Sequence, residues 1–259
     1  MANQIPLPDK ITINDKKDNN YQVVIEPFYP GFGVTVANAL RRVLLSSLPG
    51  GAVTSFKIDG VQHEFDTIDG VKEDVVEIML NLKKLRVHVF SDEPVKLSLS
   101  AKGEKVVTAK DISKNSDVEV VTPELVIATL TEKTSKMEME IIVEKGLGYE
   151  TVEQREKQKL EIGTIAIDSS FSPVLNVGYN IENVRVGKMT NYEKVTFDIL
   201  TDGTIDADTA IKAAATILKD HFDVWSNIAN IENEEEVAED EEADSEDEDD
   251  EEVETEDEE

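Results

Sequence analysis

The feature that most limits how this chain can fold is a block of acidic residues between positions 232 and 259. The block holds 21 of the 56 Asp and Glu residues of the 259-residue chain, and it contains no Lys, Arg or aromatic residue. Such a segment repels itself and has too little apolar surface to offset the entropy lost on ordering. We therefore expect it to be a disordered acidic tail that avoids DNA, because phosphate binding needs Lys and Arg.

Residues 1–231 have the composition of a folded protein. They carry 35 acidic against 26 basic residues, a net charge of −9, and 39% of the whole chain is hydrophobic. The absence of cysteine excludes disulfides, thiolate metal sites and a thiol nucleophile. No apolar run reaches about 18 residues, and the first 20 residues are polar, so a cytoplasmic protein without membrane contact is expected.

Patterns of apolar residues predict a mixed fold. Apolar side chains recur at helical spacing in three segments, while β-branched residues and period-two alternation mark the strands. We expect helices over 34–48, 71–83 and 206–228. We expect strands over 21–28, 52–58, 85–90, 95–100, 137–143, 162–167, 179–186 and 194–200, with a charged loop over 153–161. The predicted fold class is α+β.

Residues able to carry catalysis form no recognisable motif. The three histidines, His63, His88 and His221, stand in neither HxxxH nor HExxH spacing, so no zinc site is predicted. The turn at 31–33 lacks the third glycine of a dinucleotide-binding loop, and a turn with Thr35 as helix N-cap explains it better. We predict no catalytic residue and no metal ligand in this chain.

The helix expected over 34–48 has an unusual outward face. Its core stripe should consist of Val36, Ala39, Leu40, Val43 and Leu44. Arg41, Arg42 and Leu45 then point the other way. A large apolar residue between arginines is typical of a protein interface, although single surface leucines are also common and need no explanation.

The helix expected over 206–228 is long for one that packs only against its own domain. Its alanines permit close approach of another helix, whereas its bulky residues exceed what one small domain can cover. We therefore expect a dimer with twofold symmetry. The predicted dimer residues are Phe32, Ile217, Leu218, Phe222 and Trp225.

Two adjoining segments carry a resemblance to a known family. YPGFG (29–33) and NALRRVLLSSLPG (38–50) resemble the signature segment of the alpha subunit of bacterial RNA polymerase. The likeness continues in family order through IDGVQHEF (58–65), GVKEDVVEIMLNLKKL (70–85), KGLGY (145–149), DSSFSPV (168–174), YNIENVRV (179–186) and DGTIDADTAI (202–211). The chain departs from the family at Ala37, at Gly51, and in the acidic block, which occupies the place of the linker and carboxy-terminal DNA-binding domain.

The resemblance implies a particular organisation. Family members dimerise through a discontinuous domain of a sheet plus two helices, here 1–51 and 176–231. A strand-rich α+β domain, here 52–175, is inserted into it. The resemblance also implies a scaffold that assembles the beta and beta-prime subunits of a nucleotidyltransferase, which transcribes DNA into RNA, without being catalytic itself.

Residue roles also follow from the resemblance. Arg41, Arg42 and Leu45 match the contact with the beta subunit, and Lys83 and Ile167 match the surface that faces beta-prime. No cofactor is expected in this chain, because magnesium and zinc belong to other subunits. Omega and sigma complete the holoenzyme, and DNA is contacted only indirectly.

Two other classes of function remain as alternatives. The acidic block alone suggests a chaperone for basic proteins, which should lose its partners when that block is removed, whereas a scaffold should still assemble. A free-standing enzyme is the third class, and no motif favours it.

Overall fold

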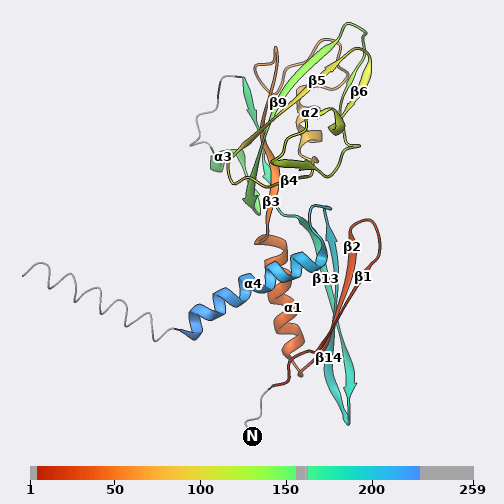
Figure 1. Cartoon of the computed structure of the whole chain (residues 1–259), viewed down its shortest axis with the longest axis vertical. Coiled ribbons are helices and arrows are strands. Elements are labelled where there is room, and N and C mark those ends of the chain that lie inside the picture. The colour runs from red at the N-terminus through yellow and green to blue at the C-terminus, as the bar shows by residue number, and fades with distance from the viewer. Residues whose placement is uncertain (1–4, 156–160, 162, 228–259) are drawn as a thin grey trace, which may run out of the picture. The chain divides into compact units, whose positions relative to one another are not determined.

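The computed structural model describes residues 5–155, 161 and 163–227 (Figure 1). It confirms the α+β class. The chain divides into two compact units, 1–214 and 215–259. The acidic block at 232–259, and most of the charged loop expected over 153–161, lie outside the described residues.

A four-stranded antiparallel sheet is built from both ends of the first unit. Its strands are β1 (Lys10–Asp15), β2 (Asn20–Phe28), β13 (Val174–Val186) and β14 (Met189–Thr201), in the order β1-β2-β14-β13. The helix α1 (Phe32–Ser46) contacts β13 and β14. Val23, Val195 and Phe197 are buried on this sheet. Segments about 170 residues apart in the sequence therefore share one sheet, since Phe197 pairs with Val23.

A six-stranded sheet is formed by the middle of the chain. It contains β5 (Val95–Lys102), β9 (Lys136–Leu147), β3 (Pro49–Ile58), β4 (Val87–Val89) and β7 (Val118–Val120) in that order, and β11 (Thr164–Ala166) pairs with β3. In β5 buried and exposed residues alternate strictly, as expected for a strand with one face on a core. This sheet supplies most of the largest apolar cluster.

The helix α2 (Val75–Leu82) packs its apolar face into that cluster. Val75, Ile78 and Leu82 are buried at helical spacing. The Asp74 carboxylate caps the helix by accepting a hydrogen bond of 2.7 Å from the backbone N–H of Glu77. The end of α2, where Lys83 follows, is thereby fixed on the sheet.

Shorter elements complete the first unit. They are β6 (Lys105–Thr108), η1 (Ala109–Asp111), β8 (Val126–Leu130), β10 (Tyr149–Glu150), α3 (Val152–Arg155) and β12 (Ser169–Ser170). β6 pairs with β8, and β10 pairs with β12. The sequence did not predict these elements, nor β1 and β7, because they are short or, like β1, exposed on both faces.

The N-terminus of α1 depends on a side chain distant in the sequence. Gly31 precedes the helix at φ 85°, a left-handed conformation that glycine adopts readily. The Glu193 carboxylate on β14 accepts hydrogen bonds from the backbone N–H groups of Gly31 (2.9 Å) and Gly33 (2.8 Å). This satisfies two donors at the helix end and places a negative charge at the positive end of the helix dipole.

The prediction for this helix was partly wrong. The helix begins two residues earlier than expected, and Thr35 lies inside it rather than capping it, because Glu193 supplies the cap. Leu40 and Leu44 of the predicted core stripe are buried, as is Ala37. The strand after α1 starts directly at Pro49.

The helix α4 (Ala207–Ser226) crosses from the first unit into the second. In the first unit its alanines Ala207, Ala210 and Ala214 are buried. In the second unit, Ile217 and Leu218 are half-buried, while Phe222 and Trp225 are exposed. The predicted helix over 206–228 is thus found, and its last position lies outside the described residues.

We predict that Glu193→Gln lowers the free energy of unfolding by about 0.5 to 2 kcal/mol, because the amide leaves one backbone donor of α1 without an acceptor. Urea denaturation measures this loss. Glu182→Gln on the same hairpin is the control, and its exposed ion pair with Lys194 should contribute less than about 1 kcal/mol. Equal losses in the two variants would show that the cap does not stabilise α1.

Candidate subunit interface

The outward face of α1 carries the first group of predicted contact residues. Arg41 and Arg42 are exposed, and Leu45 is half-buried. Arg41 is held in place, since its Nε donates to the carbonyl oxygen of Val177 on β13 at 3.0 Å. The Arg42 side chain makes no hydrogen bond or ion pair with any residue that the structure describes. Arg42 is therefore the arginine of this face that is available to a partner.

The C-terminal end of α1 lies against a corner of the other sheet. The Ser172 hydroxyl donates to the carbonyl oxygen of Leu45 at 3.0 Å. A Cβ at Gly148 would lie 3.6 Å from the carbonyl oxygen of Ser46. The C-terminal end of α1 is consequently adjacent to the segment that contains Tyr149.

Lys83 belongs to a cluster at this corner. Its ammonium nitrogen lies 3.5 Å from Asp168 Oδ2, 3.4 Å from the Tyr149 hydroxyl oxygen and 5.4 Å from the centroid of the Tyr149 ring. The Tyr149 hydroxyl donates to Asp168 Oδ2 at 3.1 Å, and the Val152 backbone N–H donates to Asp168 Oδ1 at 3.0 Å. The carboxylate of Asp168 thus joins three chain segments.

The hydrogen bond from the Val152 backbone holds the pKa of Asp168 below its usual range. Partial burial opposes this shift, and Tyr149 and Lys83 add smaller lowering contributions. The folded-state pKa is the lower one, so the stabilisation by Asp168 is complete above the unfolded pKa of about 3.9 and disappears as the pH falls through the folded value. At neutral pH Asp168 is a carboxylate and pairs with Lys83.

Ile167 is not a surface residue. Its side chain is 2% exposed and belongs to the main apolar cluster. Its backbone N–H donates to the carbonyl oxygen of Thr54 at 2.9 Å. The expectation of a surface position for this side chain is therefore wrong, because strand β11 brings the residue onto β3 with its side chain inward.

Arg155 fixes the backbone around Ile167. Its guanidinium donates to the carbonyl oxygens of Thr54 and Ile167 and, at 2.9 Å, to the Ser169 hydroxyl. Its Nε lies 3.4 Å from the Glu150 carboxylate, without the geometry of a hydrogen bond. Arg155 thereby supplies donors at a point where β3 is irregular, between Val53 and Ser55.

Apolar side chains remain exposed beside this cluster. Leu80 is 50% exposed, Leu147 is 62% exposed and Tyr149 is 55% exposed. Leu80 lies one helical turn before Lys83, and Leu147 is two residues before Tyr149. Exposed leucine and tyrosine side chains near a fixed polar cluster are typical of a protein-binding surface.

The predicted dimer residues fall into two groups, one in each compact unit. Phe32 in the first unit is half-exposed and makes an edge contact with Tyr29, which in turn contacts Tyr192. In the second unit the rings of Phe222 and Trp225 meet edge to face at 5.6 Å, and both remain more than half exposed. No contact between these two groups is determined.

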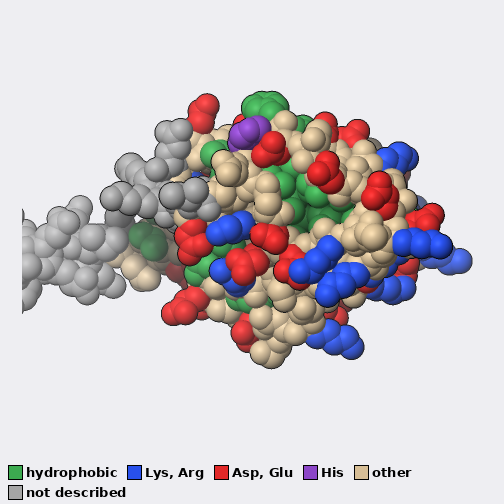
Figure 2. All heavy atoms as spheres, turned by 90° about the horizontal axis from the view of Figure 1, so that it is seen from above, with side chains coloured by type: hydrophobic (Ala, Val, Ile, Leu, Met, Phe, Trp, Pro, Cys, Tyr) green, Lys and Arg blue, Asp and Glu red, His purple; other side chains and the backbone are tan. Residues whose placement is uncertain are grey.

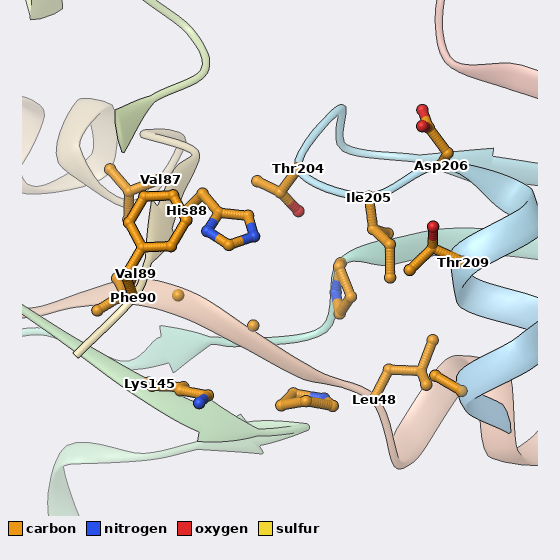
Figure 3. Close-up of a pocket in the computed structure, with 15 residues that line it drawn as sticks. Leu48, Val87, His88, Val89, Phe90, Lys145, Thr204, Ile205, Asp206 and Thr209 are labelled. Atoms are coloured by element: carbon orange, nitrogen blue, oxygen red, sulfur yellow. The ribbon is translucent and has the colours of Figure 1, made fainter. Parts of the chain in front are cut away.

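A pocket of about 580 Å³ lies between β3, β4 and the turn before α4 (Figure 3). His88 extends from β4 toward this turn, with its ring 4.5 Å from that of Phe90. The charged side chains of the lining already have partners in the chain. Lys145 pairs with Asp92 at 2.8 Å, and Asp206 accepts a hydrogen bond from Tyr21. Among the lining residues that the structure describes, no hydrogen bond joins the His88 ring to the hydroxyl of Thr204 or Thr209, and Thr204 donates to Asp202 instead.

Charged side chains of both signs are interspersed on the face seen in Figure 2. Basic side chains gather toward one side of this face, with acidic side chains among them (Figure 2). Oppositely charged side chains also pair across strands, as between Lys96 and Glu140 at 2.9 Å.

None of the described helices is long and apolar enough to cross a membrane. Within 5–155, 161 and 163–227, no three His, Cys, Asp or Glu side chains are grouped so that they could hold a metal ion. The three histidines lie on separate elements.

Sequence reasoning missed Tyr149, Asp168 and Arg155 as members of the site. Tyr149 and Asp168 are included in the segments that carry the family resemblance. Neither residue has a spacing that predicts its contact with Lys83, which is 66 residues from Tyr149. The pairing of β10 with β12 brings the Tyr149 and Asp168 segments together, and the end of α2 supplies Lys83 from a third segment.

We predict that Ile167→Ala lowers the free energy of unfolding by about 2 to 5 kcal/mol, because it leaves a cavity in the core, whereas Ile167→Val costs about 0.5 to 1.5 kcal/mol. Chemical denaturation of both variants tests this. Leu175→Ala, at a half-exposed leucine, should cost clearly less. A loss below about 0.5 kcal/mol for Ile167→Ala would contradict the buried position.

Comparison with known proteins identifies the family. Residues 56–172 match the family described as the RNA polymerase Rpb3/RpoA insert domain. The chain is 49% identical over 225 residues to a DNA-directed RNA polymerase subunit alpha of Symbiobacterium thermophilum, covering 86% of this chain and 71% of that protein. It is 47% identical over 207 residues to the subunit alpha of Oceanobacillus iheyensis (80% and 66% covered), and 45% identical over 238 residues to that of Moorella thermoacetica (89% and 76% covered). These identities extend through both sheets, and the chain therefore belongs to the family of DNA-directed RNA polymerase alpha subunits, with a role in transcription.

Proposed function

We propose that this chain is a homodimeric scaffold that assembles the beta and beta-prime subunits of its RNA polymerase. Two copies present the same surface to two unlike partners. One copy holds beta through Arg41, Arg42 and Leu45, and the other copy holds beta-prime through the corner that contains Lys83. The observation that carries the proposal is the outward face of α1, where an exposed arginine lies beside a half-buried leucine.

Exposed apolar side chains on α4 support dimer formation. Phe222 and Trp225 form an aromatic pair that water still reaches. Large exposed aromatic side chains are costly in a monomer and are enriched at interfaces. A second copy of α4 buries them with twofold symmetry, and an obligate interface of this kind covers roughly 2,000 Å² or more.

The Arg42 side chain can bind a partner that supplies hydrogen-bond acceptors. Arginine offers five donors in a planar fork, which matches a carboxylate or a pair of backbone carbonyls. Arg41 is already engaged with Val177, so the two arginines differ in role. In the proposed complex Arg42 binds the partner, Leu45 provides the apolar anchor, and Arg41 fixes the helix on its sheet.

Catalysis is assigned to other subunits in this proposal. Magnesium and zinc are likewise placed there, and omega and sigma join the assembled enzyme. The dimer domain corresponds to 1–51 and 176–231 and the inserted domain to 52–175. The acidic block at 232–259, outside the described residues, is proposed to make no promoter contact, because it has no cation. The proposed site of action is the cytoplasm.

We predict that Arg42→Ala weakens capture of the beta subunit and leaves the dimer intact. Loss of one partner of a desolvated charged pair costs about 2 to 5 kcal/mol of binding. This corresponds to roughly 30-fold to several thousand-fold in affinity. Beta capture by the tagged chain and the sedimentation mass of the free chain are measured on the same protein.

Lys102→Ala is the matched control, since it removes one positive charge from the far end of β5. It should leave both readouts unchanged. If a folded, dimeric Arg42→Ala chain captured beta normally, the proposed beta contact would be wrong. If Arg42→Ala lost both dimer formation and beta capture, this face of α1 would instead belong to the dimer interface.

A further inference from the structure

The charge of Lys83 is engaged inside the chain. Asp168 lies 3.5 Å from its ammonium nitrogen, and the ring and hydroxyl of Tyr149 complete its surroundings. A lysine that contacts an acidic partner directly presents its charge to solvent before binding. Here Asp168 balances the charge of Lys83 before any partner binds.

Apolar and aromatic side chains close to Lys83 and Tyr149 in the sequence are exposed, alongside the charged Lys84. Leu80, Leu147 and Tyr149 are each half or more exposed, whereas Ile167 is buried below them. Tyr149 is restrained by its hydroxyl, which donates to Asp168 at 3.1 Å. Its ring is therefore held in one orientation while a large part of it stays accessible.

We propose that Asp168 is a positioning residue for the beta-prime surface: it holds Lys83 and Tyr149 so that the exposed Tyr149 ring meets an apolar segment of the partner. This inference rests on the proposed function. It changes the role of Lys83 from a direct contact to a support for the Tyr149 ring.

Asp168 contributes mainly by holding several groups in place, and less by the strength of its ion pair with Lys83. Side chains as exposed as Lys83 and Asp168 gain little from pairing in water. Asp168, however, also accepts from the Val152 backbone, which links α3 to the same carboxylate. Restraining several side chains before binding reduces the entropy lost when the partner docks.

Asp168 is itself fixed by its two buried neighbours in the chain, Ile167 and Ser169. Ile167 is bound through its N–H to Thr54 and through its carbonyl oxygen to Arg155. The Ser169 hydroxyl donates to the carbonyl oxygen of Val53 at 2.7 Å. Asp168 lies between these two anchored residues. A change at Ile167 is therefore expected to displace the Asp168 carboxylate and, with it, the Tyr149 ring.

Asp168→Asn separates the two roles of Lys83. Affinity for purified beta-prime is measured on a preassembled complex of the dimer with beta, at low and high salt. We predict a loss of roughly tenfold, equivalent to about 1.4 kcal/mol, with an unchanged slope against salt concentration. Affinity that stays the same or rises, with a steeper salt dependence, would show that the released lysine binds an acidic partner and would overturn the proposal.

Further variants keep the test decisive. Lys83→Met should weaken binding to a similar degree, and the double variant with Asp168→Asn should be no weaker than either one, because both act through the same ring. If the losses of binding free energy of the two single variants added fully in the double variant, Lys83 and Asp168 would not act through the same ring. Tyr149→Phe retains the ring and should lose less affinity than Tyr149→Ala, whereas equal losses would count against the ring as the contact.

Controls distinguish this inference from the proposed function. Asp59→Asn removes an exposed carboxylate near the start of the inserted region and should change nothing. Hydrogen exchange at the Val152 amide should accelerate in Asp168→Ala, while beta capture stays normal. If the unaltered chain fails to bind beta-prime, the proposed function is wrong. If it binds and Asp168→Asn binds equally well at both salt concentrations, only the positioning role is wrong.

Discussion

The antiparallel pairing of β3 with β9 determines where the candidate interface lies. β3 follows α1 after two residues, and the register places Pro49 opposite Leu147. The end of α1 is thereby brought beside Gly148, and Tyr149 follows immediately. Without this register the arginine face of α1 and the Lys83 cluster would belong to separate surfaces.

As a consequence, the helix that carries Arg41 and Arg42 ends beside the segments that carry Tyr149 and Asp168 on the same copy of the chain. The carbonyl oxygen of Leu45 accepts from Ser172, and the segment that leads to Ser172 contains Asp168. Under the proposed function this proximity favours a dimer, because a second copy offers the same surface to the second partner.

Local patterns predicted the elements whose apolar residues repeat regularly. α4, β2 and β5 lie close to their predicted bounds. α2 begins four residues later than predicted, and β9 and β14 extend four and five residues beyond the predicted strands. The start of α1 was predicted two residues late, because its cap is a carboxylate 160 residues away from Gly33. Short strands such as β7, with three residues, carry too little pattern to be recognised.

The candidate site was predictable only in part, for a similar reason. The outward face of α1 follows from helical spacing, and the structure exposes Arg41 and Arg42 there. The engagement of Lys83 by Asp168 and the burial of Ile167 depend on pairing between distant strands, which no local spacing reveals. The family resemblance identified Lys83 and Ile167 as candidate residues. Their contacts and burial are seen only in the structure.

The stoichiometry of the assembled enzyme tests the scaffold account most directly. The tagged chain is coexpressed with the beta and beta-prime subunits of its own organism, and the purified complex is weighed by native mass spectrometry. The account predicts two copies of this chain for each beta and each beta-prime. A complex with a single copy, or a chain that purifies as a monomer without either partner, would contradict it.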